Sequence, residues 1–300
     1  MTDPCQTYRS LLCISFFLLM LVAGCTSIRP ELYPGPAVTA PPTHFDYQSY
    51  QRMLTSFVDH RGGVNYAELV QNRGDMEAFY RQIAAHSPDS HPNLFTDEKA
   101  QLAYWINSYN LTTIKGVVQH YPISSVEDVP PPLLLFFLPR KSGFFFFQRF
   151  TFGGVQTSLY YLENQVIRKR FVDPRYHFAL NCASKSCPEL PREPFYPDRL
   201  GEQLDREAAN FINDKRHVLY DAESKTLYLS SIFDWYESDF ISWLRAGKPV
   251  PNMTLVDYVL LYLEEQTARQ VKYDRAELNI AYLPYDWGLN DASSDRNTVK

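Results

Sequence analysis

The 300-residue chain has few cysteines, few histidines and no long run of one charge. Five cysteines and seven histidines provide few metal ligands, and the His-x₄-Cys-x₄-Cys spacing at residues 177–187 differs from the two-residue spacing of common zinc sites. The formal charge is −5 and no basic run occurs, which argues against nucleic-acid binding. We therefore expect no cofactor, no metal and no nucleic-acid partner.

Apolar runs long enough to span a bilayer are also absent. Residues 11–23, "LLCISFFLLMLVA", are short for a membrane span but have the length of a signal-peptide core. The run leads into "VAGC", ending at Cys25, which resembles the lipobox of bacterial lipoproteins. We expect residues 1–24 to be removed and Cys25 to carry a lipid, although a chance cysteine after an ordinary signal peptide is the alternative. Thr26 then favours an outer-membrane anchor with the protein facing the periplasm.

Signal cleavage would determine which thiols remain. Cys5 and Cys13 leave with residues 1–24, and lipidation occupies Cys25. The mature chain then keeps Cys182 and Cys187 as its other cysteines, in a compartment where disulfides persist.

The rest of the chain has the composition of a folded domain, with 45% hydrophobic and 15% aromatic residues. Residues 25–43 form a proline-rich tether, residues 44–290 one domain, and residues 291–300 a disordered tail. The apolar spacing predicts a helix-rich α+β fold around a small mixed or antiparallel sheet. Helices are expected at 45–60, 65–70, 76–85, 96–120, 158–171, 197–214, 232–247 and 254–269, strands at 176–182 and 278–285, and a hairpin at 217–230.

The clearest predicted helix covers residues 96–120, with Thr96 as its N-cap and a broad apolar face. Asn107 and Asn110 lie inside it among bulky neighbours. A buried asparagine needs a polar partner, so we favour a structural role for both over a catalytic one.

Residues 130–154 contain two apolar runs around the polar turn "PRKSG". The pattern predicts a hairpin over 133–152, with phenylalanines on both faces of its second strand. It could press on a membrane or a partner. We favour a strand pair inside the core, because exposed aromatic patches are rare on soluble domains.

The stretch "HFALNCASKSCPEL" at residues 177–190 allows three interpretations. A disulfide between Cys182 and Cys187 is the leading one, because these cysteines are close enough in sequence to pair. A catalytic cysteine would need a base such as His177, and Glu163, Asn107 or Asp234 to orient that base. A metal site lacks an evident fourth ligand.

Several strings resemble the domain of unknown function 547 family of bacteria and plants. They are "WINSYN" at 105–110, the segment 158–163 ending at Glu163, "HFALNCASKSCP", "LSSIFDWYESDF" and the closing "YDWGLN". The resemblance implies no established activity. By analogy it suggests a distant papain- or transglutaminase-like fold, in which Cys182 or Cys187 is the nucleophile and His177 the base, with Glu163 and Asn107 as polar support. Asn164 stands where the family pattern leads us to expect histidine.

Two hypotheses about function follow. The first is an envelope lipoprotein that binds a protein or cell-wall partner and carries a structural Cys182–Cys187 disulfide. The second is a cysteine-dependent hydrolase or acyltransferase that acts on peptide or isopeptide bonds. It rests on Cys182, Cys187, His177, Glu163 and Asn107.

Overall fold

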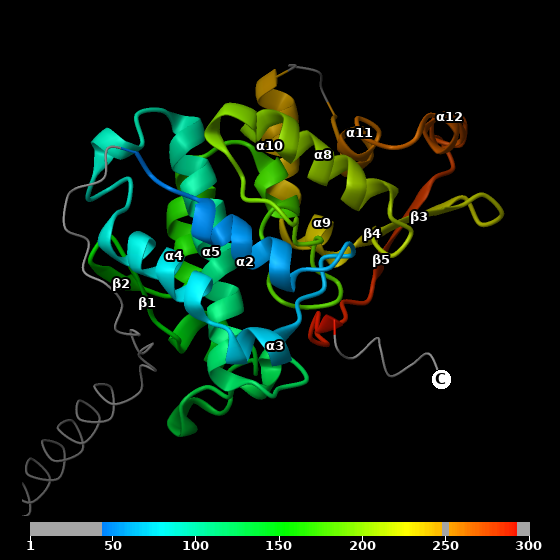
Figure 1. Ribbon diagram of the computed structural model, residues 1–300. Helices are drawn as coiled ribbons and strands as arrows, with labels where there is room; N and C mark the ends of the chain where they lie inside the picture. Colours follow the sequence, from blue (N-terminus) through cyan, green and yellow to red (C-terminus); the bar gives the residue numbers. More distant parts are fainter. Residues whose placement is uncertain (1–43, 248–251, 293–300) are drawn as a thin grey trace, which may run out of the picture.

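The computed structural model describes residues 44–247 and 252–292 (Figure 1). These residues form a helix-rich α+β fold with a two-stranded and a three-stranded sheet, which confirms the predicted fold class. The expected signal peptide, Cys25, the tether up to residue 43 and residues 293–300 of the predicted tail 291–300 lie outside the described residues. Within the described ranges, no helix has the length and apolar character needed to cross a bilayer.

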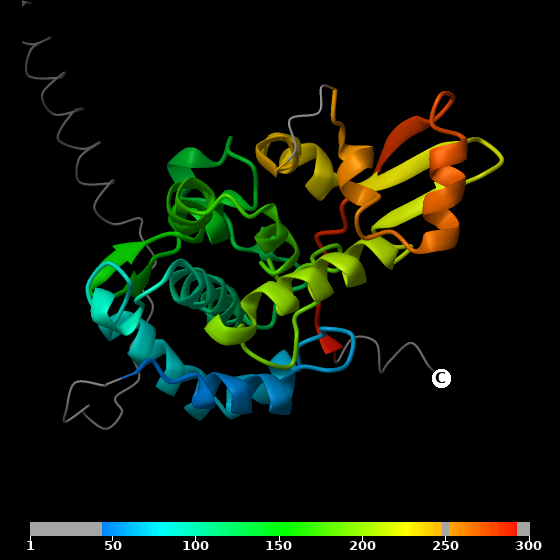
Figure 2. The same cartoon turned by 90° about the horizontal axis from the view of Figure 1, so that it is seen from above.

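The first of two hydrophobic cores surrounds α5 (Glu98–His120), the longest helix among the described residues (Figures 1 and 2). Asp97 caps it by accepting a hydrogen bond from Ala100 N at 2.8 Å, so the prediction of Thr96 as the cap was wrong. Nearly every residue from Ala100 to Val118 is buried, because other helices cover α5 on several sides. Two of these are α3 (Tyr66–Gln71) and α4 (Gly74–Ala85), and α2 (Gln48–Phe57) packs on α4.

The two buried asparagines of α5 both bond main-chain groups. Asn107 donates to Phe195 O at 2.7 Å and accepts from Phe195 N at 2.9 Å. Asn110 donates to Ala179 O and accepts from Asn181 N, both at 2.8 Å. These contacts supply the structural partners that the sequence led us to expect, and they fix two loops against the helix.

The second core contains the three-stranded sheet, in the order β3-β4-β5, on the side of the molecule away from α5 (Figure 2). The predicted hairpin is confirmed as β3 (Val218–Asp221) and β4 (Thr226–Ser230), while β5 (Asn279–Leu283) pairs in parallel with β4. The helices around this sheet are α8 (Leu200–Asn213), α9 (Ser231–Trp235), α10 (Glu237–Gly247), α11 (Leu255–Val259) and α12 (Glu265–Tyr273).

The helix expected over 254–269 is therefore two helices, α11 and α12. Asn213 holds the break between them: its amide donates to Tyr262 O at 2.8 Å and its oxygen accepts from Glu264 N at 2.7 Å. Apolar periodicity alone could not reveal this break, because the asparagine that stabilises it belongs to α8.

The strand expected at 176–182 is also absent. Asp173 instead caps a 3₁₀ helix, Pro174–Phe178, by accepting from Arg175 N at 3.1 Å. The irregular chain that follows bonds the Asn110 side chain, so a helix side chain satisfies main-chain groups that a neighbouring strand would otherwise pair.

The phenylalanine-rich segment is not a hairpin buried in the core. It forms a 3₁₀ turn, Leu133–Leu135, and a π-helical turn, Gly143–Phe147, before strand β1 (Phe150–Phe152). β1 pairs with β2 (Val155–Thr157) across Gly153 and Gly154, whose φ values of 54° and 85° suit the turn. Prolines at 130–132 and 139 disfavour a strand in the first apolar run, since they lack N–H groups for a ladder. Phe144 is buried, but several residues of the first run are exposed.

Between β2 and the 3₁₀ helix Pro174–Phe178, the predicted helix at 158–171 is present but irregular. It consists of α6 (Leu159–Tyr161), a π-helical turn (Leu162–Ile167) and α7 (Arg168–Arg170). After β5, the chain returns to the first core through bridges from Gly288 to Ser125 and from Leu289 to Ser184. This returning segment connects the two cores.

Candidate functional site

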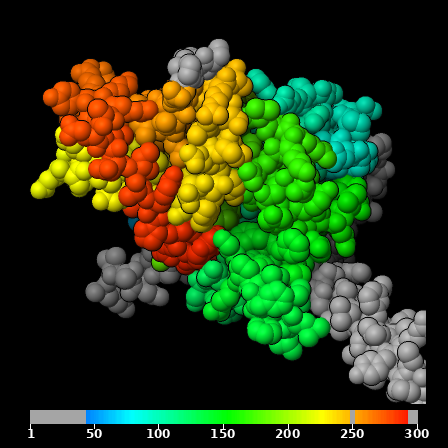
Figure 3. Space-filling view, turned by 180° about the vertical axis from the view of Figure 1, so that it is seen from behind, coloured from blue at the N-terminus to red at the C-terminus, as the bar shows by residue number. Residues whose placement is uncertain are grey.

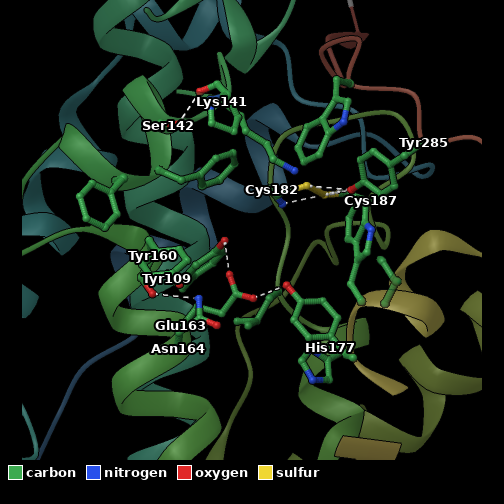
Figure 4. A pocket seen from close by; sticks show the side chains of 18 of the residues that line it. Tyr109, Lys141, Ser142, Tyr160, Glu163, Asn164, His177, Cys182, Cys187 and Tyr285 are labelled. Carbon is green, nitrogen blue, oxygen red and sulfur yellow. Dashed lines mark hydrogen bonds between the residues drawn. A yellow bond between two sulfur atoms is a disulfide. The ribbon is translucent and has the colours of Figure 1, made fainter. Parts of the chain in front are cut away.

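A pocket of about 590 Å³ lies at the junction of the two cores. Figure 3 shows the hollow where the green, yellow and red parts of the chain meet, and Figure 4 shows its side chains. Most of the lining is aromatic or aliphatic. Within the described part of the chain, the lining includes Tyr109, Leu138, Lys141, Phe145, Phe146, Tyr160, Glu163, His177, Cys182, Cys187, Ile232, Trp235, Tyr236, Tyr285 and Trp287.

Glu163 lies between two tyrosines, on the π-helical turn Leu162–Ile167 (Figure 4). Its Oε2 accepts a hydrogen bond from Tyr109 Oη at 3.2 Å, and its Oε1 accepts from Tyr236 Oη. Burial, followed by the charge of Glu163, raises the pKa of both tyrosines well above the usual value. Both therefore remain protonated donors near neutral pH, and they hold the carboxylate in position in the pocket.

His177 is held by Asp239 on α10. Its Nε2 lies 2.9 Å from Asp239 Oδ2, and its ring stacks on Tyr236 with a centroid distance of 3.9 Å. Burial lowers the pKa of His177, although the hydrogen bond to Asp239 opposes this effect. The neutral ring then donates Nε2–H to the carboxylate, which leaves Nδ1 as an acceptor.

Arg168 completes this network. Its guanidinium forms two bonds to Asp239, at 2.8 and 3.0 Å, and a third to Asn164 Oδ1 at 2.8 Å. Burial of Asp239 favours the neutral acid, but the bonds from His177 and Arg168 outweigh it and hold the pKa of Asp239 well below its usual range. Asp239 is therefore an ionised group that orients His177.

The predicted disulfide between Cys182 and Cys187 is present, with 6.0 Å between the Cα atoms, and both residues line the pocket. Tyr285 Oη lies 3.0 Å from Cys182 Sγ and 3.3 Å from Cys187 Sγ, and it accepts a hydrogen bond from Ser184 Oγ at 3.0 Å. Burial raises the pKa of Tyr285, so its hydroxyl stays protonated beside the sulfurs. Neither sulfur is a free thiol in this state.

Three aromatic rings form one wall of the pocket. Trp235 and Trp287 are within 17° of parallel with centroids 6.0 Å apart, and Tyr285 lies 4.8 and 4.5 Å from them. Lys141 Nζ lies 4.3 Å from the Trp287 ring centroid and 5.0 Å from that of Trp235. Burial lowers the pKa of Lys141, while Glu127 and Glu163 oppose the shift. The wall thus already contacts an ammonium group through cation–π interactions.

Residues 93–212 match the model of a family described as "Protein of unknown function, DUF547". This part of the chain is a DUF547 domain. No curated protein and no solved structure matches the chain.

The DUF547 domain contributes four of the five residues singled out from the sequence to the pocket: Glu163, His177, Cys182 and Cys187. The fifth, Asn107, does not line it and bonds the main chain of Phe195 instead. Asp234, considered as a group that orients the base, is exposed and also lies outside the lining. Asp239 occupies that position beside His177. Cys25 lies outside the described residues.

Several residues of the site were not identified from the sequence, and most of them lie after residue 212 in the chain. Asp239, Tyr236 and Trp235 belong to "DWYESDF", and Tyr285 and Trp287 to "YDWGLN". From the sequence alone, both strings serve only as evidence of the family resemblance. A concentration of tryptophan, tyrosine and aspartate in two short strings could have indicated a shared site. Lys141 gave a weaker signal, as a charged residue between two apolar runs.

The pocket can bind a ligand through aromatic faces and one carboxylate. In the part of the chain described, Glu163 bonds tyrosine hydroxyls and forms no ion pair with lysine or arginine. Nor do the described residues contain a group of three or more histidine, cysteine, aspartate or glutamate side chains placed to hold a metal. The aromatic faces and the Glu163 carboxylate suit recognition of a flat or apolar group together with a hydrogen-bond donor.

Proposed function

We propose that this protein is a ligand-binding module of the cell envelope, anchored by a lipid on Cys25. Its pocket binds an amine-bearing peptide of the cell wall. The observation that carries this proposal is Glu163, which Tyr109 and Tyr236 hold in an aromatic pocket and which forms no ion pair with a lysine or arginine among the described residues. A ligand ammonium group would supply the missing charge.

The aromatic wall supports the same class of ligand. Lys141 already contacts Trp235 and Trp287, so these rings accept an ammonium group at a short distance. An amine-bearing side chain could bind beside Lys141 or displace it. Apolar parts of the ligand would pack on the rings, and its main chain would remain near the opening.

Binding of purified muropeptides, measured by isothermal titration calorimetry, tests this function. A charge-assisted hydrogen bond contributes roughly 1.5–3 kcal/mol, so E163Q should weaken binding by about 10- to 100-fold. The matched control is D234N, which neutralises an exposed carboxylate outside the pocket lining. N-acetylation of the ligand amine should weaken binding to the wild-type protein as strongly as E163Q does.

Three results would contradict the proposal. If none of the muropeptides bound, the proposal that the ligand is a cell-wall peptide would be wrong. Equal affinity for free and acetylated amines would remove the role of Glu163 as counterion. An intact mass showing an unmodified N-terminus at a residue other than Cys25 would remove the envelope anchor.

A cysteine-dependent hydrolase or acyltransferase is the second candidate. Its support is that Cys182, Cys187 and His177 line one pocket and that Asp239 orients His177. The disulfide must first be reduced by an external dithiol, because a thiolate is the nucleophile that attacks a peptide carbonyl. This candidate requires hydrolysis that appears only after reduction and is lost in C182A or C187A.

A further inference from the structure

The segment 133–137, "LLLFF", projects large apolar side chains into solvent. Leu133 is 86% exposed, Leu134 59%, Phe136 79% and Phe137 70%. Figure 1 shows this part of the chain as a lobe beyond the end of α5, and Figure 3 shows the same lobe as a green projection. Four such side chains within five residues are unusual on a protein that stays in water. We call this segment the apolar loop.

The backbone of the apolar loop is suited to an environment without water. Leu135 N donates to Pro132 O at 2.7 Å, and Leu138 N donates to Leu135 O at 3.0 Å. The prolines at 130–132 and 139 have no N–H group to satisfy. Internal bonds and prolines therefore reduce the number of donors that would lose water on insertion into an apolar phase.

We propose that the apolar loop inserts into the surface of an anionic lipid bilayer. The loop is convex, and residues 133–138 are all apolar, whereas a protein interface normally mixes apolar anchors with hydrogen-bonding groups. Arg140 lies two residues after this run, its side chain is 74% exposed, and its Nη2 atom is 3.9 Å from Asp128 Oδ1. A cationic side chain beside exposed phenylalanine and leucine is the arrangement that binds the interface of anionic lipids.

The lipid proposed on Cys25 would keep a membrane within reach of the apolar loop. Residues 26–43 separate the expected lipid on Cys25 from the folded part, and 18 extended residues span at most about 60 Å. Insertion of the loop would also hold the pocket close to the lipid, because Leu138, Lys141 and Phe146 of the same segment line it. The insertion itself does not depend on which ligand the pocket binds.

Tryptophan fluorescence of the full chain mixed with phosphatidylglycerol-containing vesicles tests the insertion. F136W places a reporter in the loop. Y273W is the matched control, since Tyr273 is 85% exposed but lies on α12 in the second core. Because the chain has four tryptophans of its own, the quantity compared is the change in emission when vesicles are added. We expect F136W emission to shift to shorter wavelength and to be quenched by brominated acyl chains beyond any change in the wild type, and the change in Y273W to equal that in the wild type.

A further variant separates the loop from the reporter. Adding L133S and F137S to F136W should abolish the shift and the quenching, while circular dichroism stays unchanged because the replaced side chains are exposed. Two results would overturn the proposal. One is quenching of F136W no greater than that of Y273W. The other is an F136W shift that appears with added envelope proteins but not with lipid alone, which would assign the loop to a protein partner.

Discussion

Replacing Asp239 by asparagine tests the charged network behind the pocket. The substitution keeps the shape of the side chain but removes the charge that pairs with Arg168 at 2.8 and 3.0 Å. The two side chains are 26% and 21% exposed, so the pair is intermediate between a buried and a surface ion pair. Breaking a buried pair costs about 3–5 kcal/mol and a surface pair contributes about 0–1 kcal/mol. We expect D239N to lose about 2 kcal/mol of unfolding free energy at neutral pH.

The same variant has a predicted pH dependence. The pKa of Asp239 is lower in the folded state than in the unfolded state, where aspartate titrates near 3.9. Its stabilising contribution is therefore complete above about pH 5 and is lost as the pH falls toward the depressed folded value. The stability difference between wild type and D239N should narrow in acid.

Urea denaturation followed by circular dichroism between pH 7 and pH 3 measures both effects. E237Q is the control, because Glu237 is an exposed carboxylate in the first turn of the same helix. It should change stability by less than about 0.5 kcal/mol. A loss in D239N no larger than that of E237Q, or a difference that widens in acid, would refute the reasoning.

Two further predictions concern residues around the site. By intact mass, the mature chain should show no alkylatable thiol before reduction and two after it, and a free thiol before reduction would contradict the disulfide. The variant C182S/C187S should lose on the order of 2 kcal/mol of unfolding free energy, a modest loss because the closed loop is short. N107A should lose about 2–3 kcal/mol of unfolding free energy, measured by urea denaturation, because it leaves the main-chain groups of Phe195 unpaired. Its affinity for muropeptides should not change. Weaker binding at unchanged stability would instead give Asn107 a direct role.

Local patterns predicted the elements whose partners are near in sequence. The apolar stripe of α8 and the alternation of the β3–β4 hairpin each follow from periodicity within one element. The disulfide is predicted by counting the cysteines that the expected signal cleavage would leave. In these cases few alternative structures compete, because the local sequence itself limits which residues can pair or pack.

Long-range contacts account for most of what the sequence did not reveal. Asp239 lies 62 residues from His177, and Tyr285 lies 103 residues from Cys182. No spacing rule connects such pairs. The prediction for the phenylalanine-rich segment was wrong for a different reason. Apolar composition favours burial on average, but it does not say whether the apolar side chains are buried against protein or against lipid.

The match to the DUF547 family model ends at residue 212, before several groups that complete the pocket. Tyr236 supplies one of the two hydrogen bonds to Glu163, Asp239 orients His177, and Tyr285 covers the disulfide. Without these residues Glu163 would keep only Tyr109, and Arg168 would lose its ion pair. Residues 93–212 alone therefore cannot form the site. The functional unit must extend at least to Trp287, because the aromatic wall and the charged network both come from the chain that follows the DUF547 domain.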